Sequence, residues 1–128
     1  MLARIDAGFE EVVNALIKLD IASGIYYEVL PTSPRTAVAV GEKYFIRAGN
    51  SLAATTILVE ASGYTYVKVI ATGAREGILD FLDLGSSRDY ARMIVEKLAE
   101  ETGSSYTILA EAHHLDAFQA QRLWLHGA

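Results

Sequence analysis

The stretch that most constrains the fold is KYFIRAGNSLAATTILV, residues 43–59. Strand-favouring Tyr, Phe, Ile, Thr and Val residues lie on both sides of Gly49-Asn50. A glycine followed by an asparagine is typical of a two-residue type II′ turn, because the first central position needs a positive φ angle. The stretch therefore predicts a hairpin that pairs Ala48 with Ser51, Ile46 with Ala53 and Tyr44 with Thr55. Residues Arg47 to Asn50 would form either an ordinary hairpin tip or the rim of a functional site.

This register predicts which side chains share a face of the sheet, because opposed residues point the same way. A three-residue loop, Ala61-Ser62-Gly63, would then align the next strand. The predicted core face holds Tyr44, Ile46, Ala53, Thr55, Ile57, Val59, Val67, Val69 and Ala71. The predicted outer face holds Lys43, Phe45, Arg47, Leu52, Ala54, Thr56, Leu58, Glu60, Tyr64, Tyr66, Lys68 and Ile70.

The predicted outer face mixes leucines and aromatic residues with three cations, which is a large apolar surface for a lone subunit. We expect another molecule to cover it. The candidate interface or ligand residues are Lys43, Phe45, Arg47, Leu58, Tyr64, Tyr66, Lys68 and, in the C-terminal segment, Trp124.

The rest of the chain predicts an α+β fold. Apolar residues at three- and four-residue spacing predict one helix from Phe9 to about Ala22, ended by Ser23-Gly24, and a second from Ser86 or Ser87 to near Thr102-Gly103. Strands are expected at about 2–6, 25–30, 36–47, 51–60 and 64–72. Two layers follow, in which both helices cover one face of an antiparallel, curved sheet.

We expect a single domain spanning residues 1–128, with a core at 1–103 and a C-terminal extension at 104–128. Within the extension, Tyr106 to Ala110 fits either a sixth strand or helix, and Glu111 to Leu125 favours a helix. The apolar extension should pack on the domain or on a second copy.

Composition narrows the classes of function. The chain has 128 residues, 52% of them hydrophobic, no cysteine and a net charge of −5. Acidity disfavours general binding of nucleic acid, although the segment from Arg35 to Arg75 carries five basic and two acidic residues. That local basic zone fits either an anionic ligand or scattered solvent-facing side chains. Because the N-terminus lacks signal-peptide features and no run is long enough to span a bilayer, we expect a cytoplasmic protein with no membrane segment.

Four further patterns bear on chemistry. His113, His114 and Asp116 have helical spacing suited to a metal but are too few for a site, so we expect no metal and no cofactor. Glu76, Asp80 and Asp83 fit acid–base chemistry or a charged surface turn. The loop from Thr72 to Gly77 matches no phosphate-binding fingerprint.

Tyr64, Tyr66 and Phe45 beside cations resemble a base-stacking platform, which a sheet-to-sheet dimer would also use.

The run EKYFIRAGNSLAATTILV, followed by VKVIATGAREGILDFLDLG and a closing amphipathic helix, resembles a family of small uncharacterised prokaryotic proteins. The resemblance covers about residues 2 to 102. It implies a strand-helix-four-strand-helix layout and supplies no catalytic residue. The same order, β-α-β-β-β-β-α, is similar to that of the curved-sheet class that contains the TATA-box-binding protein and the helix-grip ligand carriers, which by itself transfers no function.

Three hypotheses follow from the sequence. The first is a non-enzymatic homo-oligomer, most simply a dimer, that buries the outer sheet face together with the C-terminal segment. The second is a binding protein for a small apolar or anionic ligand, held in a groove between sheet and helix. The third is an enzyme of unknown class, which would need His113 or His114 to meet Glu76 or Asp80; the sequence contains no recognisable catalytic constellation, so we favour a non-enzymatic role.

Overall fold

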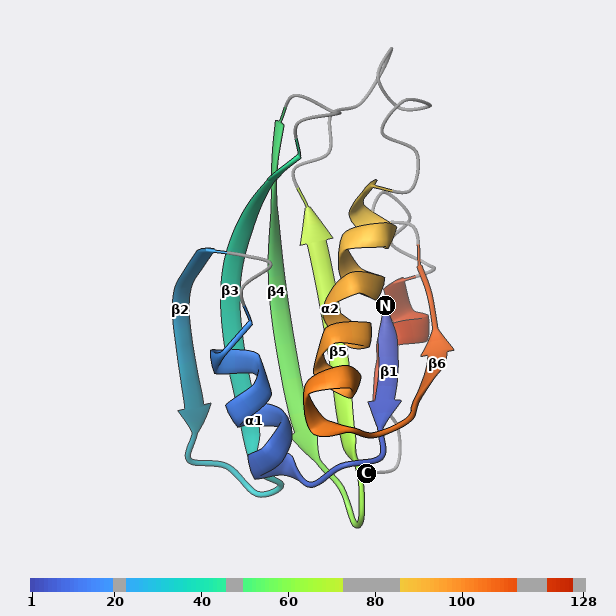
Figure 1. Cartoon of the computed structure of the whole chain (residues 1–128). Helices are drawn as coiled ribbons and strands as arrows, with labels where there is room; N and C mark the ends of the chain where they lie inside the picture. The colour runs from blue at the N-terminus through green and yellow to red at the C-terminus, as the bar shows by residue number, and fades with distance from the viewer. Residues whose placement is uncertain (20–22, 46–49, 73–85, 113–119, 126–128) are drawn as a thin grey trace.

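The computed structural model describes residues 1–19, 23–45, 50–72, 86–112 and 120–125. Within these ranges, six strands form one antiparallel sheet in the order β2-β3-β4-β5-β1-β6. Helices α1 and α2 both lie on one face of it, which makes the predicted two-layer α+β fold (Figure 1). The elements in chain order are β1 (Leu2–Ile5), α1 (Phe9–Ile17), β2 (Ser23–Leu30), β3 (Thr36–Phe45), β4 (Asn50–Glu60), β5 (Thr65–Thr72), α2 (Ser86–Thr102), β6 (Tyr106–Ala110) and the 3-10 helix η2 (Gln121–Leu123).

The bounds of α2 agree with the prediction, including the stop at Gly103. Gly103 has a φ angle of +63°, which glycine adopts without steric cost. Its N–H donates to the carbonyl of Glu100, and the N–H of Ser104 donates to that of Ala99. This pair of bonds is the Schellman arrangement that satisfies the last carbonyls of a helix.

Helix α1 is shorter than predicted. It begins at Phe9 but ends at Ile17, with Lys18 as its C-cap. Ser23-Gly24 do not end this helix, as the sequence suggested, because both residues already belong to β2. The strand-favouring residues that follow Ser23-Gly24 extend β2 back to include these two residues.

The hydrophobic core lies between the two helices and the sheet. Its largest fully buried apolar side chains come from α1, α2 and the strands β1, β4 and β5: Val12, Tyr90, Val95, Leu98, Ile5, Leu52, Leu58, Val67 and Val69. Tyr106 and Ile108 of β6 pack against its margin. Residues 106–110, left open between strand and helix by the sequence, therefore form a strand that extends the sheet beyond β1.

The predicted register of the first hairpin is wrong. Strand β3 pairs Phe45 with Asn50 and Tyr44 with Ser51, whereas a two-residue Gly49-Asn50 turn would pair Tyr44 with Thr55. The four positions 46–49 therefore separate the paired strands; they lie outside the described residues. The shift spans an even number of residues, so the side chains of β3 and β4 still share faces as predicted.

The second hairpin changes the assignment of faces. Glu60 pairs with Thr65, and the N–H of Ala61 donates to the carbonyl of Tyr64. The loop therefore contains two residues, Ser62 and Gly63, with Gly63 at a φ angle of +84°, and not the three that were predicted. A change of one residue reverses every side chain of β5 relative to β4.

As a result, the predicted core and outer faces are partly exchanged. Leu52, Ala54, Thr56 and Leu58, expected to point outward, are buried beneath the helices with Val67, Val69 and Ala71. Ala53, Thr55, Ile57 and Val59, expected in the core, lie on the face away from the helices. The pairing of Leu58 with Val67 gives the helices a continuous apolar surface, and burial of that surface is the dominant favourable term in folding.

An exposed arginine joins α1 to two strand ends. Arg35 forms ion pairs with Glu10 at 3.0 Å and Glu60 at 2.7 Å, and its guanidinium lies 4.9 Å from the ring centroid of Phe9. The hydrogen bond from Arg35 lowers the pKa of Glu60. This contact fixes the N-terminal end of α1 over the edge of the core.

Thr65 supplies a testable anchor for the start of β5. Its hydroxyl, fully buried, donates to the carbonyl of Ala7 at 2.9 Å. We expect Thr65→Val to lower the free energy of unfolding by about 1 to 2 kcal/mol, because a buried carbonyl loses its partner. Urea denaturation measures this change. Thr65→Ser is the control, since it keeps the hydroxyl; a Ser variant less stable than the Val variant would contradict the role of the hydrogen bond.

Candidate functional site

The face of the sheet that the helices leave uncovered is called the open face. It is formed by alternate residues of five strands, which the register aligns across the sheet, and by Tyr64 just before β5, whose ring meets that of Tyr66. The strand residues are Leu2, Arg4, Tyr26, Glu28, Leu30, Thr36, Val38, Val40, Glu42, Ala53, Thr55, Ile57, Val59, Tyr66, Lys68 and Ile70. More than half of these side chains are apolar or aromatic. Uncovered faces of antiparallel sheets are normally polar, so this face is unusual.

An aromatic and cationic cluster lies on the open face where β1 pairs with β5. The guanidinium of Arg4 lies 3.9 Å from the ring centroid of Tyr64. The rings of Tyr64 and Tyr66 meet edge to face at 5.2 Å, and their hydroxyls are 3.1 Å apart. That hydrogen bond raises the pKa of Tyr66. Tyr66 therefore remains neutral near physiological pH, and the two rings present a fixed aromatic surface.

Asp6 holds Arg4 over this cluster. Arg4 donates two hydrogen bonds to Oδ1 of Asp6, at 3.0 and 2.9 Å, and Ser105 donates to Oδ2 at 2.9 Å. The hydrogen bonds from Arg4 and Ser105 lower the pKa of Asp6. The carboxylate thus links β1 to the turn before β6.

Opposite charges occupy opposite halves of the open face. One continuous row of cross-strand pairs runs from β1 to β2 and contains, in order, Leu2, Lys68, Ile57, Val38 and Glu28. Ile57 lies on β4, with the cation on one side of it and the acid on the other.

The basic half carries Arg4 and Lys68, on β1 and β5, and the acidic half carries Glu28 and Glu42, on β2 and β3. Tyr26 donates a hydrogen bond of 2.6 Å to Glu28, so this carboxylate has a defined position.

The C-terminal segment is associated with the β1 end of the open face. Leu2 is only 6% exposed although its register places it on this face, and it is buried apart from the main core. Figure 1 shows η2 behind β1 and β6, on the side of the sheet away from the two α-helices. Trp124 follows η2 and is 57% exposed.

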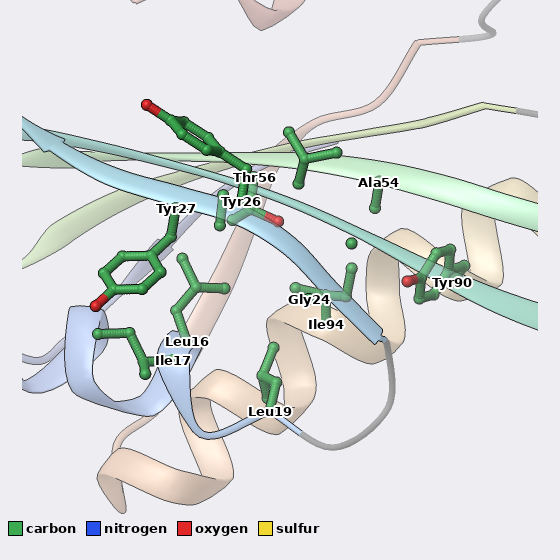
Figure 2. A pocket seen from close by; sticks show the side chains of 13 residues that line it. Leu16, Ile17, Leu19, Gly24, Tyr26, Tyr27, Ala54, Thr56, Tyr90 and Ile94 are labelled. Atoms are coloured by element: carbon green, nitrogen blue, oxygen red, sulfur yellow. The ribbon is translucent and has the colours of Figure 1, made fainter.

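The other face contains a cavity of about 260 Å³ between the sheet and the helices. It lies under β2 and β3, the part of the sheet that α1 and α2 cover least. Figure 2 shows Leu16 and Ile17 of α1 on one side, Ile94 of α2 beneath, and Gly24 near the middle. Tyr26 and Tyr27 are neighbours in β2 whose rings point to opposite sides of the strand (Figure 2).

Four hydroxyl-bearing residues line this mostly apolar cavity: Thr56 and Tyr90 are buried, whereas Tyr26 and Tyr27 on the edge strand β2 are exposed. Thr56 lies on the sheet, and Tyr90 lies on α2 at one end of the cavity, with its hydroxyl turned inward (Figure 2). Burial raises the pKa of Tyr90 to about 12, and the carboxylate of Glu42 acts in the same direction. The phenol is therefore neutral at physiological pH and able to donate a hydrogen bond.

The structure brings together only part of the predicted interface. Tyr64, Tyr66 and Lys68 share the open face, and the sequence did not place Arg4 beside them. Leu58 is fully buried in the core, so it cannot contribute to an interface. Lys43 pairs with Leu52, which the register of the second hairpin turns toward the helices, so Lys43 lies half-buried on the helix-side face and not on the open face as predicted. Phe45 ends β3, whereas Arg47 lies outside the described residues.

The predicted chemical clusters fall outside the described ranges. His113, His114 and Asp116 are among them, as are Glu76, Asp80 and Asp83. The described residues contain no group of three or more potential metal ligands. Within the same ranges, no helix has the length and apolar character needed to cross a membrane.

These features define a small α+β protein with an uncovered apolar sheet face and a cavity between sheet and helices. The chain belongs to the family of unknown function DUF6054, whose model matches residues 4–102. The expected membership of an uncharacterised family is thus confirmed, and the C-terminal extension lies beyond the match. The chain matches no curated protein and no solved structure.

The contact between Arg4 and Asp6 predicts a pH dependence. Because the folded pKa of Asp6 is below its ordinary value of 3.8, its contribution to stability is present above that value and is lost as the pH falls through the folded pKa. We expect Asp6→Asn to reduce the acid sensitivity of the thermal midpoint below about pH 4, with Asp89→Asn, at an exposed helical site, as the control. Equal acid sensitivity in the Asp6 variant and wild type would contradict this assignment.

Proposed function

We propose that this protein is a non-enzymatic homodimeric module whose open faces pack against each other. The observation that supports this most directly is the apolar character of the open face. Its centre is formed by Val38, Val40, Ile57 and Val59. The apolar surface is extended toward solvent by Ile70, which is 41% exposed, and by Tyr26, which is 54% exposed. A patch of this kind on a soluble subunit marks an interaction surface.

The size of the open face suits a dimer. The four strands β2 to β5, at about 4.8 Å spacing and with eight residues at about 3.3 Å rise, cover roughly 500 Å² in plan. Side-chain relief makes the accessible area larger than the plan. Standard stable interfaces bury about 800 Å² on each partner, so two open faces packed as a sandwich reach the required size.

The charge pattern supports a second copy as the partner. A two-fold axis parallel to β4 would place β5 and β1 of one subunit over β3 and β2 of the other. Lys68 would then lie near the partner copy's acidic half, where a lysine side chain reaches Glu28, and the same contact would repeat by symmetry. An axis perpendicular to the strands would instead superpose like charges, which is unfavourable.

The C-terminal segment fits the rim of this interface. It associates with β1, which such an axis would place over β2 of the partner. Trp124 would then have an aromatic surface nearby in Tyr26, whose ring is exposed on the open face. Aromatic residues of this kind are enriched in interfaces.

A second candidate function is binding of a small ligand. The cavity beneath β2 and β3 supports it, because it is bounded by both helices and three strands. This cavity lies on the helix side of the sheet. The sequence instead suggested a ligand near Tyr64, Tyr66 and Lys68, which lie on the opposite face. The two candidate functions use opposite faces and are compatible with each other.

The first test places a charge on the proposed axis. Because Ile57 would face its own copy, Ile57→Glu should bring two carboxylates together and weaken dimerisation by at least about 100-fold. Sedimentation velocity at micromolar concentration measures the effect. Val29→Glu is the matched control, since Val29 is a β-branched strand residue exposed on the other face. A monomeric wild-type protein, or equal dimerisation by all three proteins, would refute the proposal.

The second test exchanges charges between subunits. Lys68→Glu and Glu28→Lys should each weaken the dimer, because each places like charges across the interface. Mixing the two variants should restore dimerisation, since each new acid then meets a new base. Sedimentation of the single variants and of an equimolar mixture provides the comparison. Failure of the mixture to associate better than either variant alone would rule out the proposed axis.

A further inference from the structure

The cavity between sheet and helices has features that specify a class of ligand. We infer that it binds an uncharged, mostly apolar small molecule that carries a single hydroxyl or carbonyl group. This inference rests on the ligand-binding candidate function, and it is independent of the dimer.

The volume of the cavity limits the size of the ligand. A dry cavity of about 150 Å³ lined by aliphatic side chains accommodates benzene. In proportion, the 260 Å³ present here suits a molecule of about ten non-hydrogen atoms. Larger ligands such as nucleotides or long-chain lipids exceed this space, so the candidate is a medium-chain or single-ring compound.

The side chains that line the cavity favour a mostly apolar ligand. Leu16, Leu19 and Ile94 contribute aliphatic side chains, and Ala39 and Ala54 leave room by being small. Gly24 leaves still more room, because a Cβ atom at this position would meet nothing within 4 Å. Apolar contacts of this kind gain free energy in proportion to the area removed from water.

The electrostatics of the cavity favour an uncharged ligand. Among the described residues that line the cavity, no side chain is charged, so a charged group would lose hydration without gaining a counter-ion. Glu42 acts on Tyr90 at one end of the cavity, and its negative charge further disfavours an anion. The hydroxyls of Thr56 and Tyr90 provide the polar character that suits one hydroxyl or carbonyl group.

The cavity opens toward solvent along the edge strand β2. Tyr27 and Ile17 point toward each other at this margin (Figure 2), and they are 58% and 48% exposed. Two large exposed apolar side chains on different elements, side by side at an opening, form an apolar entrance. A ligand that enters between them remains in contact with apolar surface throughout.

The test compares ligands of one chain length that differ in charge. We titrate the full chain with 1-nonanol, nonanoate and nonylammonium and follow backbone amide shifts by NMR. Nonanol should cause saturable shifts at Gly24, Ala39 and Gly41, and the two ions should bind at least about tenfold more weakly, because burial of a charge is costly. Absence of saturable binding by all three would overturn ligand binding itself. Equal or tighter binding of either ion would overturn only the inferred neutral class.

A filling variant locates the binding site. Gly24→Leu should abolish nonanol binding without lowering the thermal midpoint, because its side chain enters open space at a φ angle that does not require glycine. Thr107→Leu adds a leucine at an exposed strand position away from the cavity and should bind nonanol like the wild type. Unchanged binding by a folded Gly24→Leu variant would show that nonanol binds elsewhere and would overturn the assignment of this cavity.

Discussion

The pairing of Glu60 with Thr65 across Ser62-Gly63 determines how β5 faces relative to β4. It places Leu58 opposite Val67 and thereby gives the two helices one continuous apolar surface. Because β1 pairs with β5, the same turn determines that Ala3 and Ile5 point into the core and Arg4 points out. The hydroxyl of Thr65 reinforces this geometry, since it joins the first residue of β5 to the segment that leads from β1 into α1.

Unequal coverage by the helices separates two surfaces with different properties. Helix α2 packs mainly on β5, β1 and β4, and the short α1 packs on β4 and α2. The helix-side face of β2 and β3 is therefore only partly covered, and the cavity forms there. The helices leave the opposite face uncovered, and the C-terminal segment lies only at its β1 end, so association through this face and ligand binding on the helix side do not compete for the same residues.

The sequence predicted the elements better than their alignment. Helix α2 and its stop at Gly103 followed from periodicity and a glycine, both of which are local signals. The two hairpin registers did not follow, because Gly49-Asn50 and Ala61-Ser62-Gly63 each permit more than one loop length, and one residue of error exchanges faces. The contact of Arg4 with Tyr64 and the cavity beside Gly24 depend on pairing between distant strands, for which the sequence carries no local signal.

The edges of the sheet explain why association through its face is the better proposal. An exposed edge strand can add a strand from another molecule, unless it is short or irregular. Strand β6 has five residues, and β2 contains a register shift between Gly24 and Tyr26. Both features oppose continuous strand addition. The centre of the open face has no such protection. There Ile57 and its apolar neighbours Val38, Val40 and Val59 lie together, with Lys68 at their margin, so burial of this surface gains most from face-to-face packing.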